Sequence, residues 1–320
     1  MTKLSDFISL IRFKNLLIIV LIQIVIKFFL INSYLNNSSL SNFDFSIYLF
    51  ALITIVAGGY IINDIYDIEI DKINNPETII IEKELSKDLA FNAYYLLNLI
   101  GISSGFYIAS KINKLWLGII FVYFAISLWR YSKQNKTSFL IGNLQVAFLT
   151  TLSIINLALY DLIPNGIRVD DGSKIIFLII LFYAVFAFIT TLIREIIKDI
   201  EDIEGDKKIN ANTLAIRFGL QKAKQITISL IILPILGIAY FQYFQYSVLS
   251  STFSVEISYW GCSKVASVYT LFLQFLLVLL MIKTRYSETK EDFHFVSTLS
   301  KIIMLFGILS IPLFTYLHLR

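Results

Sequence analysis

Residues 45–62 read FSIYLFALITIVAGGYII, and residues 63–74 continue directly with NDIYDIEIDKIN. The first stretch is apolar and close to the length that a helix needs to cross the hydrocarbon core of a bilayer. The second stretch places three aspartates where that helix would leave the membrane. The same order recurs where the apolar residues 174–193 precede KDIEDIEGDKKIN at residues 198–210. The two stretches predict membrane-spanning helices that each end in an acidic motif.

The composition of the whole chain points to the bilayer as its solvent. Of its 320 residues, 57% are hydrophobic and only 16% are charged, which is outside the usual range of soluble domains. Apolar runs of about 20 residues cover residues 13–33, 45–62, 89–109, 114–131, 139–160, 174–193, 224–245, 265–283 and 297–318. The predicted fold class is therefore all-α, a polytopic membrane protein built as a bundle of nine transmembrane helices. Since no Pro- or Gly-rich linker divides the chain, residues 1–320 are expected to form a single domain.

The basic residues are divided unequally between the loops of the two sides. If the first helix enters from the cytoplasm, the outer loops carry only Lys111, Lys114, Arg168, Lys174, Lys264 and Arg320. The larger basic set then lies in the inner loops, which predicts a multi-pass protein of the cytoplasmic membrane whose N-terminus and acidic motifs are cytoplasmic. Lys27 lies inside the first span toward its outer end, and we expect its side chain to snorkel to the interface.

Several classes of partner and metal site are disfavoured by residue counts. The chain has 27 Lys and Arg against 23 Asp and Glu, without a basic run of the kind that binds nucleic acid. One cysteine, Cys262, and two distant histidines, His294 and His318, provide neither a disulfide framework nor a usual zinc site. We therefore expect any metal to be bound by oxygen ligands.

The two acidic motifs share one internal spacing, D-x-x-D-x-x-x-D. The first motif contains Asp64, Asp67 and Asp71, and the second contains Asp199, Asp202 and Asp206. At 3.6 residues per turn, each trio falls within an arc of roughly 60° on one helix face. Like charges at this spacing repel one another, and carboxylates are ligands for Mg²⁺, which often shares its coordination with substrate phosphates. Two facing trios thus predict a magnesium site for a phosphorylated substrate.

Two structural alternatives compete with this interpretation. A single acidic cluster at a helix end is more often a solvated terminus, but two copies with equal spacing favour a functional site. The calcium-loop pattern needs ligands at alternate positions and a glutamate at the twelfth, which neither motif supplies.

With these motifs the chain resembles the UbiA-type intramembrane prenyltransferases, a family with two Asp-rich motifs at the cytoplasmic ends of a nine-helix bundle. The resemblance rests on Asn63-Asp64-x-x-Asp67-x-x-x-Asp71 and on Lys198-Asp199-x-x-Asp202-x-x-x-Asp206. Weaker matches are Arg12-x-x-Asn15, Tyr131-Ser132 with Lys136, Gly142-Asn143, and Thr213-Leu214 with Gly219. The chain departs from the family pattern at Phe13, where a proline is usual, and at Thr78-Ile79, where Arg-Pro is usual.

The resemblance implies a reaction and a set of site residues. An allylic isoprenoid diphosphate would ionise at Mg²⁺ ions held by the six aspartates Asp64, Asp67, Asp71, Asp199, Asp202 and Asp206. Substrate-binding roles are implied for Asn63, Lys198, Arg194, Asn15, Arg12, Lys136 and Asn143. For an acceptor phosphate, Arg12, Lys136 and Lys207 are candidates.

The segment from Arg194 to Asp202 is most similar to the branch that transfers geranylgeranyl from geranylgeranyl diphosphate to geranylgeranylglyceryl phosphate in ether-lipid synthesis. Three alternatives stay open. The acceptor could instead be an aromatic ring of quinone biosynthesis, of the 4-hydroxybenzoate or dihydroxynaphthoate type. A relative that cyclises or hydrolyses its isoprenoid would keep the metal site, and an ion-coupled transporter would use intramembrane acids for a different purpose.

Overall fold

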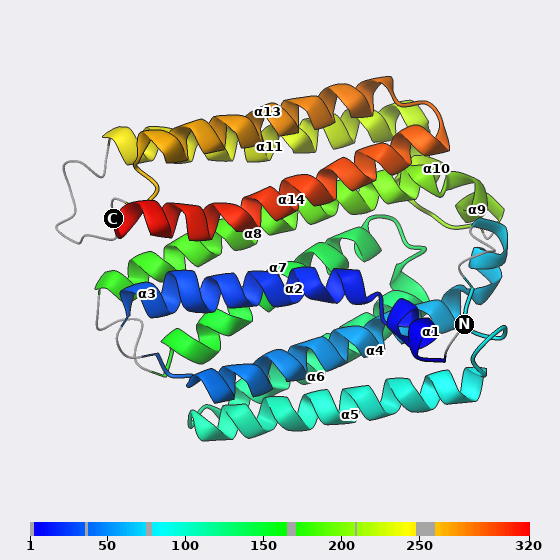
Figure 1. Ribbon diagram of the computed structural model, residues 1–320. Helices are drawn as coiled ribbons and strands as arrows, with labels where there is room; N and C mark the ends of the chain where they lie inside the picture. Colours follow the sequence, from blue (N-terminus) through cyan, green and yellow to red (C-terminus); the bar gives the residue numbers. More distant parts are fainter. Residues whose placement is uncertain (1–2, 36–37, 75–78, 165–170, 209, 248–259) are drawn as a thin grey trace.

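The computed structural model describes residues 3–35, 38–74, 79–164, 171–208, 210–247 and 260–320. Nine long helical segments run nearly parallel to one axis (Figure 1). In chain order they are α2 (Phe13–Ile24) continued by η1 (Val25–Ile31) and α3 (Asn32–Tyr34), α4 (Asn42–Asn74), α5 (Lys87–Lys111), α6 (Gly118–Arg130) continued by η4 (Tyr131–Asn135), α7 (Ile141–Leu162), α8 (Asp171–Glu201), α11 (Leu220–Ser247), α13 (Lys264–Tyr286) and α14 (Lys290–His318). The short elements are α1 (Lys3–Leu10), η3 (Leu115–Leu117), α9 (Ile203–Lys208) and α10 (Leu214–Phe218).

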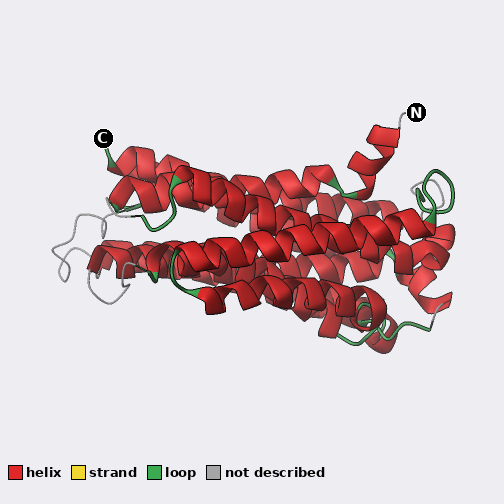
Figure 2. Ribbon diagram, turned by 90° about the horizontal axis from the view of Figure 1, so that it is seen from below, coloured by secondary structure: helices red, strands yellow, loops and turns green. Residues whose placement is uncertain are grey.

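The predicted all-α bundle of membrane helices is confirmed. Eight of the nine long segments are long and apolar enough to cross a bilayer. The ninth, α5, is more polar on average, but it is 25 residues long and packs along α4 and α6. In the described part of the chain no strand interrupts the helices (Figure 2). The termini lie at opposite ends of the bundle, as an odd number of passages requires.

Local sequence signals set the starts of several helices. Ser86 caps α5 by accepting a hydrogen bond from the Leu89 N–H, and Ser263 caps α13 in the same way through Ala266. Thr289 and Asp292 form a capping box at the start of α14. Each cap satisfies backbone donors that the first helical turn leaves free.

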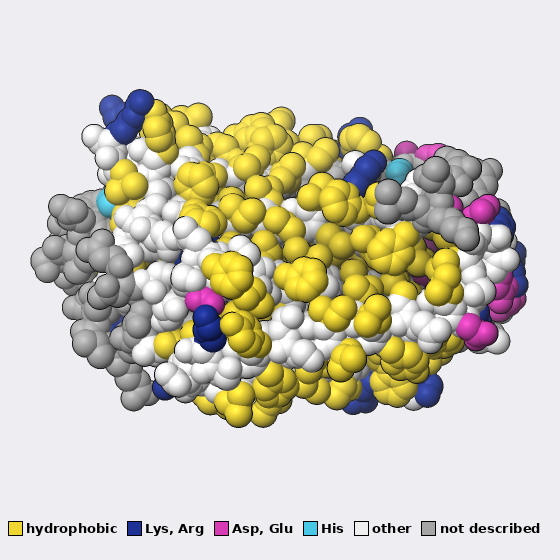
Figure 3. All heavy atoms as spheres, turned by 60° about the horizontal axis from the view of Figure 1, so that its bottom comes forward, with side chains coloured by type: hydrophobic (Ala, Val, Ile, Leu, Met, Phe, Trp, Pro, Cys, Tyr) yellow, Lys and Arg dark blue, Asp and Glu magenta, His cyan; other side chains and the backbone are white. Residues whose placement is uncertain are grey.

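The helices form two groups that meet in the middle of the molecule. On one side α4 packs with α5 and α6, and on the other α8 packs with α11 and α14. Apolar side chains such as Leu99, Leu236 and Phe275 remain exposed on the outside of the bundle. On the face drawn in Figure 3, apolar side chains cover the middle, while acidic and basic ones gather at one end. The chain is therefore a multi-pass integral membrane protein.

The expectation that Lys27 snorkels to the membrane surface is wrong. Its side chain and that of Asp161 are both 0% exposed, and Lys27 Nζ lies 2.5 Å from Asp161 Oδ2. The ammonium group also donates to the Leu40 carbonyl at 2.8 Å and to Ser38 Oγ. Asp161 Oδ1 accepts hydrogen bonds from Ser38 Oγ and the Leu40 N–H. The charge stays inside because Asp161, at the end of α7, neutralises it there.

Candidate active site

The two aspartate trios lie at the end of the bundle where the N-terminus is found (Figure 1). The first trio sits on α4, which continues past its apolar span to Asn74. The second trio does not lie on one straight helix, because α8 ends at Glu201 and α9 begins at Ile203. Asp202 stands at this break, although its N–H still donates to the Lys198 carbonyl at 2.9 Å. The expected single helix face is thus correct for the first motif and wrong for the second.

The fold brings the two motifs together. Helix α4 packs against α9, and the charge of Asp67 reaches the carboxyl of Asp206. Burial, followed by the charge of Asp202, raises the pKa of Asp206 to about 6. Burial and the charge of Asp67 likewise raise the pKa of Asp71 to about 6. Carboxyl groups from both motifs therefore share one electrostatic environment that favours a bound cation or a proton.

Basic and amide side chains hold the first trio. Arg12 Nη2 donates to Asp64 Oδ1 at 2.7 Å, and its guanidinium lies 5.2 Å from the centre of the Tyr60 ring. Asp67, which is buried, accepts from Asn63 Nδ2 at 2.5 Å and pairs with Lys136 Nζ. Arg12, Asn63 and Lys136 are thus brought together around this motif.

The second trio is held from α7. Asn143 Nδ2, near the start of that helix, donates to Asp199 Oδ2 at 2.8 Å. One turn before Asp199, Arg194 pairs with the buried Glu195 at 2.6 Å. Lys198 projects from the same helix without a hydrogen bond or ion pair to any residue that the structure describes. Among the other site candidates, Asn15 lies beside the Tyr60 hydroxyl.

The donor set fits a hard cation such as Mg²⁺. Carboxylate and amide oxygens are the ligands that this ion takes, and the Oδ1 atom of Asn63 is buried without a hydrogen-bond donor. Within the described ranges, no three acidic, histidine or cysteine side chains already stand close enough to enclose an ion. Lys136 and Arg12 supply the compensating positive charge in this arrangement. A bound metal would have to compete with these cations for Asp67 and Asp64.

The sequence interpretation missed Tyr60 and Glu195. Tyr60 lies four residues before Asp64, and Glu195 lies four residues before Asp199. Each is therefore on the trio's own helix face, one turn deeper in the membrane. A search for polar residues one turn before each motif would have found both. Thr78, at the position of the family's Arg-Pro, lies outside the described residues.

Residues 25–299 match the model of the UbiA prenyltransferase family, which is most of the chain. The chain belongs to this family. The digeranylgeranylglyceryl phosphate synthase of Methanosphaera stadtmanae is 33% identical over 253 residues, which are 79% of this chain and 80% of that protein. The enzyme of the same name from Sulfurisphaera tokodaii is 38% identical over 187 residues, which are 58% of this chain. The chain covers 61% of the length of that second relative.

Solved UbiA structures share the fold along nearly the whole chain. A digeranylgeranylglyceryl phosphate synthase superposes with a TM-score of 0.66 and 24% identity, over 98% of this chain and 99% of that one. A UbiA homologue from Archaeoglobus fulgidus, bound to GPP and Mg²⁺, superposes with a TM-score of 0.58 and 16% identity, over 96% of this chain and 99% of that one. These likenesses establish the arrangement of the helices.

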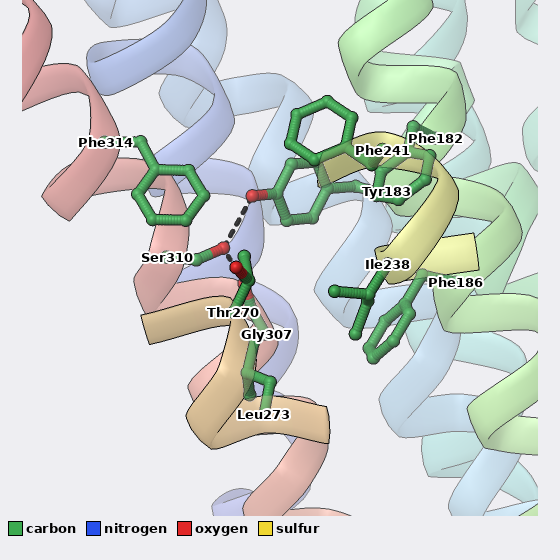
Figure 4. Close-up of a pocket in the computed structure, with 10 residues that line it drawn as sticks. All are labelled: Phe182, Tyr183, Phe186, Ile238, Phe241, Thr270, Leu273, Gly307, Ser310 and Phe314. Atoms are coloured by element: carbon green, nitrogen blue, oxygen red, sulfur yellow. Dashed lines mark hydrogen bonds between the residues drawn. The ribbon is translucent and has the colours of Figure 1, made fainter. Parts of the chain in front are cut away.

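A hollow in this UbiA bundle lies away from the acidic site. Its walls come from α8, α11, α13 and α14 and include Phe182, Phe186, Phe241 and Phe314 (Figure 4). The polar group that reaches it from α8 is the Tyr183 hydroxyl, which shares a 2.5 Å hydrogen bond with Ser310. Tyr183 and Asp199 are about 160° apart around α8, so the hollow and the acidic site are on different sides of that helix.

Gly142 positions the loop that carries Lys136. A Cβ atom at residue 142 would lie 2.7 Å from the carbonyl oxygen of Asn135, which is a backbone atom and cannot rotate away. Gly142→Ala is expected to push this loop from α7, to lower the free energy of unfolding by about 1–3 kcal/mol, and to reduce turnover. Thermal unfolding in detergent and a turnover assay measure both effects.

The matched control is Gly237→Ala in α11, where an added Cβ would meet nothing within 4 Å. This change should raise the free energy of unfolding by up to about 1 kcal/mol, because alanine is the better helix former. Equal behaviour of the two variants would contradict the role given to Gly142.

Proposed function

We propose that the protein is an intramembrane prenyltransferase that moves a prenyl group, geranylgeranyl in particular, from an allylic diphosphate to a lipid acceptor of ether-lipid synthesis. The observation that carries this proposal is the meeting of two equal aspartate motifs, from α4 and from α8–α9, at one end of an apolar bundle. Two relatives are digeranylgeranylglyceryl phosphate synthases, and a UbiA homologue of the same fold is bound to GPP and Mg²⁺. The acceptor favoured by these relatives is geranylgeranylglyceryl phosphate.

In this proposal, Mg²⁺ would be held by Asp64, Asp67, Asp71, Asp199, Asp202 and Asp206. When bound, the ion stabilises the negative charge that develops on a departing diphosphate. Asn63 offers its unpartnered Oδ1 atom to the same site, and Asn143 keeps Asp199 in place. Lys136 pairs with Asp67 and would donate to phosphate oxygens.

The surroundings of the first trio suit a reaction through an allylic cation. Ile61, Ile65 and Ile68 are buried in one apolar cluster beside the trio. Such walls exclude water, which would otherwise quench the cation before the acceptor attacks it. The exposed apolar exterior allows the isoprenoid tail to remain in the bilayer.

The same proposal includes the orientation in the membrane. With the N-terminus on the cytoplasmic side, both motifs and the loop of Lys136 face the cytoplasm, and the C-terminus lies outside. Residues 1–320 would then act as one domain. The transporter alternative finds no support, since the family that the chain matches is a prenyltransferase family.

The proposal is tested with purified protein in detergent, geranylgeranyl diphosphate and Mg²⁺. Geranylgeranylglyceryl phosphate, 4-hydroxybenzoate and dihydroxynaphthoate should be offered side by side. We expect diphosphate release and a prenylated product with the glyceryl phosphate. Product with an aromatic acceptor alone would replace the proposed acceptor, and no turnover with any allylic diphosphate would refute the proposal.

The raised pKa values of Asp71 and Asp206 predict how metal binding depends on pH. Each pKa is about 6, and a protonated carboxyl group cannot bind a cation. Metal affinity should therefore fall as the pH drops through 6, by up to about a hundredfold per pH unit if both groups titrate. Mg²⁺ titrations followed by thermal stabilisation between pH 5 and pH 8 measure this. An affinity that is unchanged at pH 5 would contradict it.

A further inference from the structure

Helices α8 and α14 run side by side, and one hydrogen bond between them marks their register. His294 Nδ1 of α14 lies 2.9 Å from Glu201 Oε1 of α8. Two turns farther into the bundle, Ile193 and Ile197 of α8 share an apolar cluster with Val296, Leu299 and Ile303 of α14. Helices α8 and α14 are antiparallel. Seven residues toward the N-terminus of α8 therefore reach the same level in the bundle as seven residues toward the C-terminus of α14. This step leads from Glu201 to Arg194 and from His294 to Lys301.

Basic side chains gather at that level. Arg194, Lys198 and Lys301, which we call the α8–α14 basic cluster, lie close enough for their charges to act on one another. The other charged groups that act on Lys301 are Glu195 and Arg12. Glu195 is already paired with Arg194, and Arg12 is paired with Asp64.

The positive charge of this cluster is only partly offset, since Glu195 pairs with Arg194 and the charges of Asp199, Asp202 and Asp206 act on Lys198. Neither Lys198 nor Lys301 has a hydrogen bond or ion pair with any of the described residues. The Nε–H of Arg194 is buried and lacks an acceptor. Lys301 is also an exposed lysine within a membrane-spanning helix, 11 residues after its start. Unpaired charges at such a position are costly, and they mark functional sites in membrane proteins.

Arg194 and the trio residue Asp199 leave α8 in different directions, whereas Lys198 lies on the side of Asp202, about 40° away. Arg194 and Asp199 are about 140° apart around the helix, and their axial separation is about 7.5 Å. Asp199 is bonded to Asn143 of α7, whereas Glu201, on the Arg194 side, is bonded to His294 of α14. A diphosphate at the trios would therefore lie beside Lys198 and leave Arg194 and Lys301 for a second anion.

We propose that Arg194, Lys198 and Lys301 bind the phosphate monoester of the lipid acceptor. A phosphate monoester carries a charge of about −1.5 to −2 at neutral pH, which matches two unpaired lysines beside an arginine. A phosphate bound between α8 and α14 would place the acceptor next to the trios, with the isoprenoid tail of the acceptor toward the lipid. This inference rests on the proposed prenyl transfer and adds the group by which the acceptor is recognised.

The test compares two acceptors that differ only in the phosphate. Binding of geranylgeranylglyceryl phosphate and of the corresponding geranylgeranylglycerol is measured by titration calorimetry in detergent, without Mg²⁺. For Lys301→Gln we expect at least a tenfold weaker binding of the phosphorylated acceptor, with no change for the alcohol or for geranylgeranyl diphosphate. Lys301→Arg should restore most of the affinity. The control is Lys222→Gln on α11, an exposed lysine, which should change none of the three.

The outcomes separate this inference from the proposed function. If Lys301→Gln weakens geranylgeranyl diphosphate binding instead, or both acceptors equally, the assignment is wrong. Displacement of the acceptor by an equal concentration of phosphatidic acid would identify a general site for lipid phosphates and would also overturn it. Failure of the wild-type protein to ionise any allylic diphosphate would refute prenyl transfer, whereas ionisation without a preference for the phosphorylated acceptor would refute only the present inference.

Discussion

Replacing Asp67 with asparagine is expected to lower turnover of the allylic diphosphate by about a hundredfold to a thousandfold, since stabilisation of developing charge is the main contribution of such a site. Asp67 is the most buried carboxylate of its trio and is bonded to both Asn63 and Lys136. The amide keeps the shape of the side chain but removes a ligand charge. Release of diphosphate and product formation, at saturating Mg²⁺, measure the loss.

The control for this variant is Asp88→Asn in the first turn of α5, an exposed carboxylate on the same chain. It should leave turnover unchanged. Thermal unfolding of both variants in detergent should show a folded bundle, because the Asp67 variant still offers an acceptor to Asn63. Full activity of Asp67→Asn would remove the aspartate from the proposed metal site.

The largest expected effect on stability comes from Lys27→Met. The change leaves Asp161 as a carboxylate with 0% exposure and no cationic partner. Breaking one half of a buried ion pair costs about 3–5 kcal/mol, because the remaining charge keeps its full desolvation penalty. Unfolding titrations in mixed detergent micelles measure the free energy of unfolding. The pair is bonded to Ser38 and Leu40, which precede α4, whereas the first trio lies near the other end of α4, so turnover per folded molecule should stay near the wild-type value.

Two further variants test the cause of that loss. Combining Lys27→Met with Asp161→Leu should recover most of the stability, since no charge is then left in the interior. Lys111→Met removes the lysine of an ion pair with Asp44 at the surface and should have no measurable effect on unfolding. A double variant as unstable as Lys27→Met alone would show that the loss comes from packing.

The positions of the helices could be predicted because each apolar run is long enough to span the hydrocarbon core of a bilayer. The helical conformation of the first acidic motif could be predicted equally well, since α4 continues without a break through Asp71. For the second motif the sequence is nearly the same, yet the helix ends at Glu201 and restarts at Ile203. Glu201, where the first motif has Tyr66, is the sequence difference nearest to this break, and Gly205 stands where the first motif has Ile70. Gly205 lies three residues beyond Asp202 and did not mark the break by itself.

Pairings between side chains that are distant in the sequence could not be predicted. Lys27 and Asp161 are 134 residues apart, and each by itself is a single charge near the end of an apolar run. Snorkelling is the usual outcome for such a lysine, and only the fold, which brings Asp161 at the end of α7 next to Lys27, makes the internal partner the better one. Lys301 was not identified as a site residue for the same reason, because the role proposed for it depends on Arg194 and Lys198 across the contact between α8 and α14.

The break at Asp202 divides the second motif between two helices. Asp199 belongs to a helix of 31 residues and is bonded to Asn143, whereas Asp206 belongs to a separate helix of six residues. The long membrane helix therefore sets the position of Asp199, whereas the position of Asp206 depends on how α9 packs against α4.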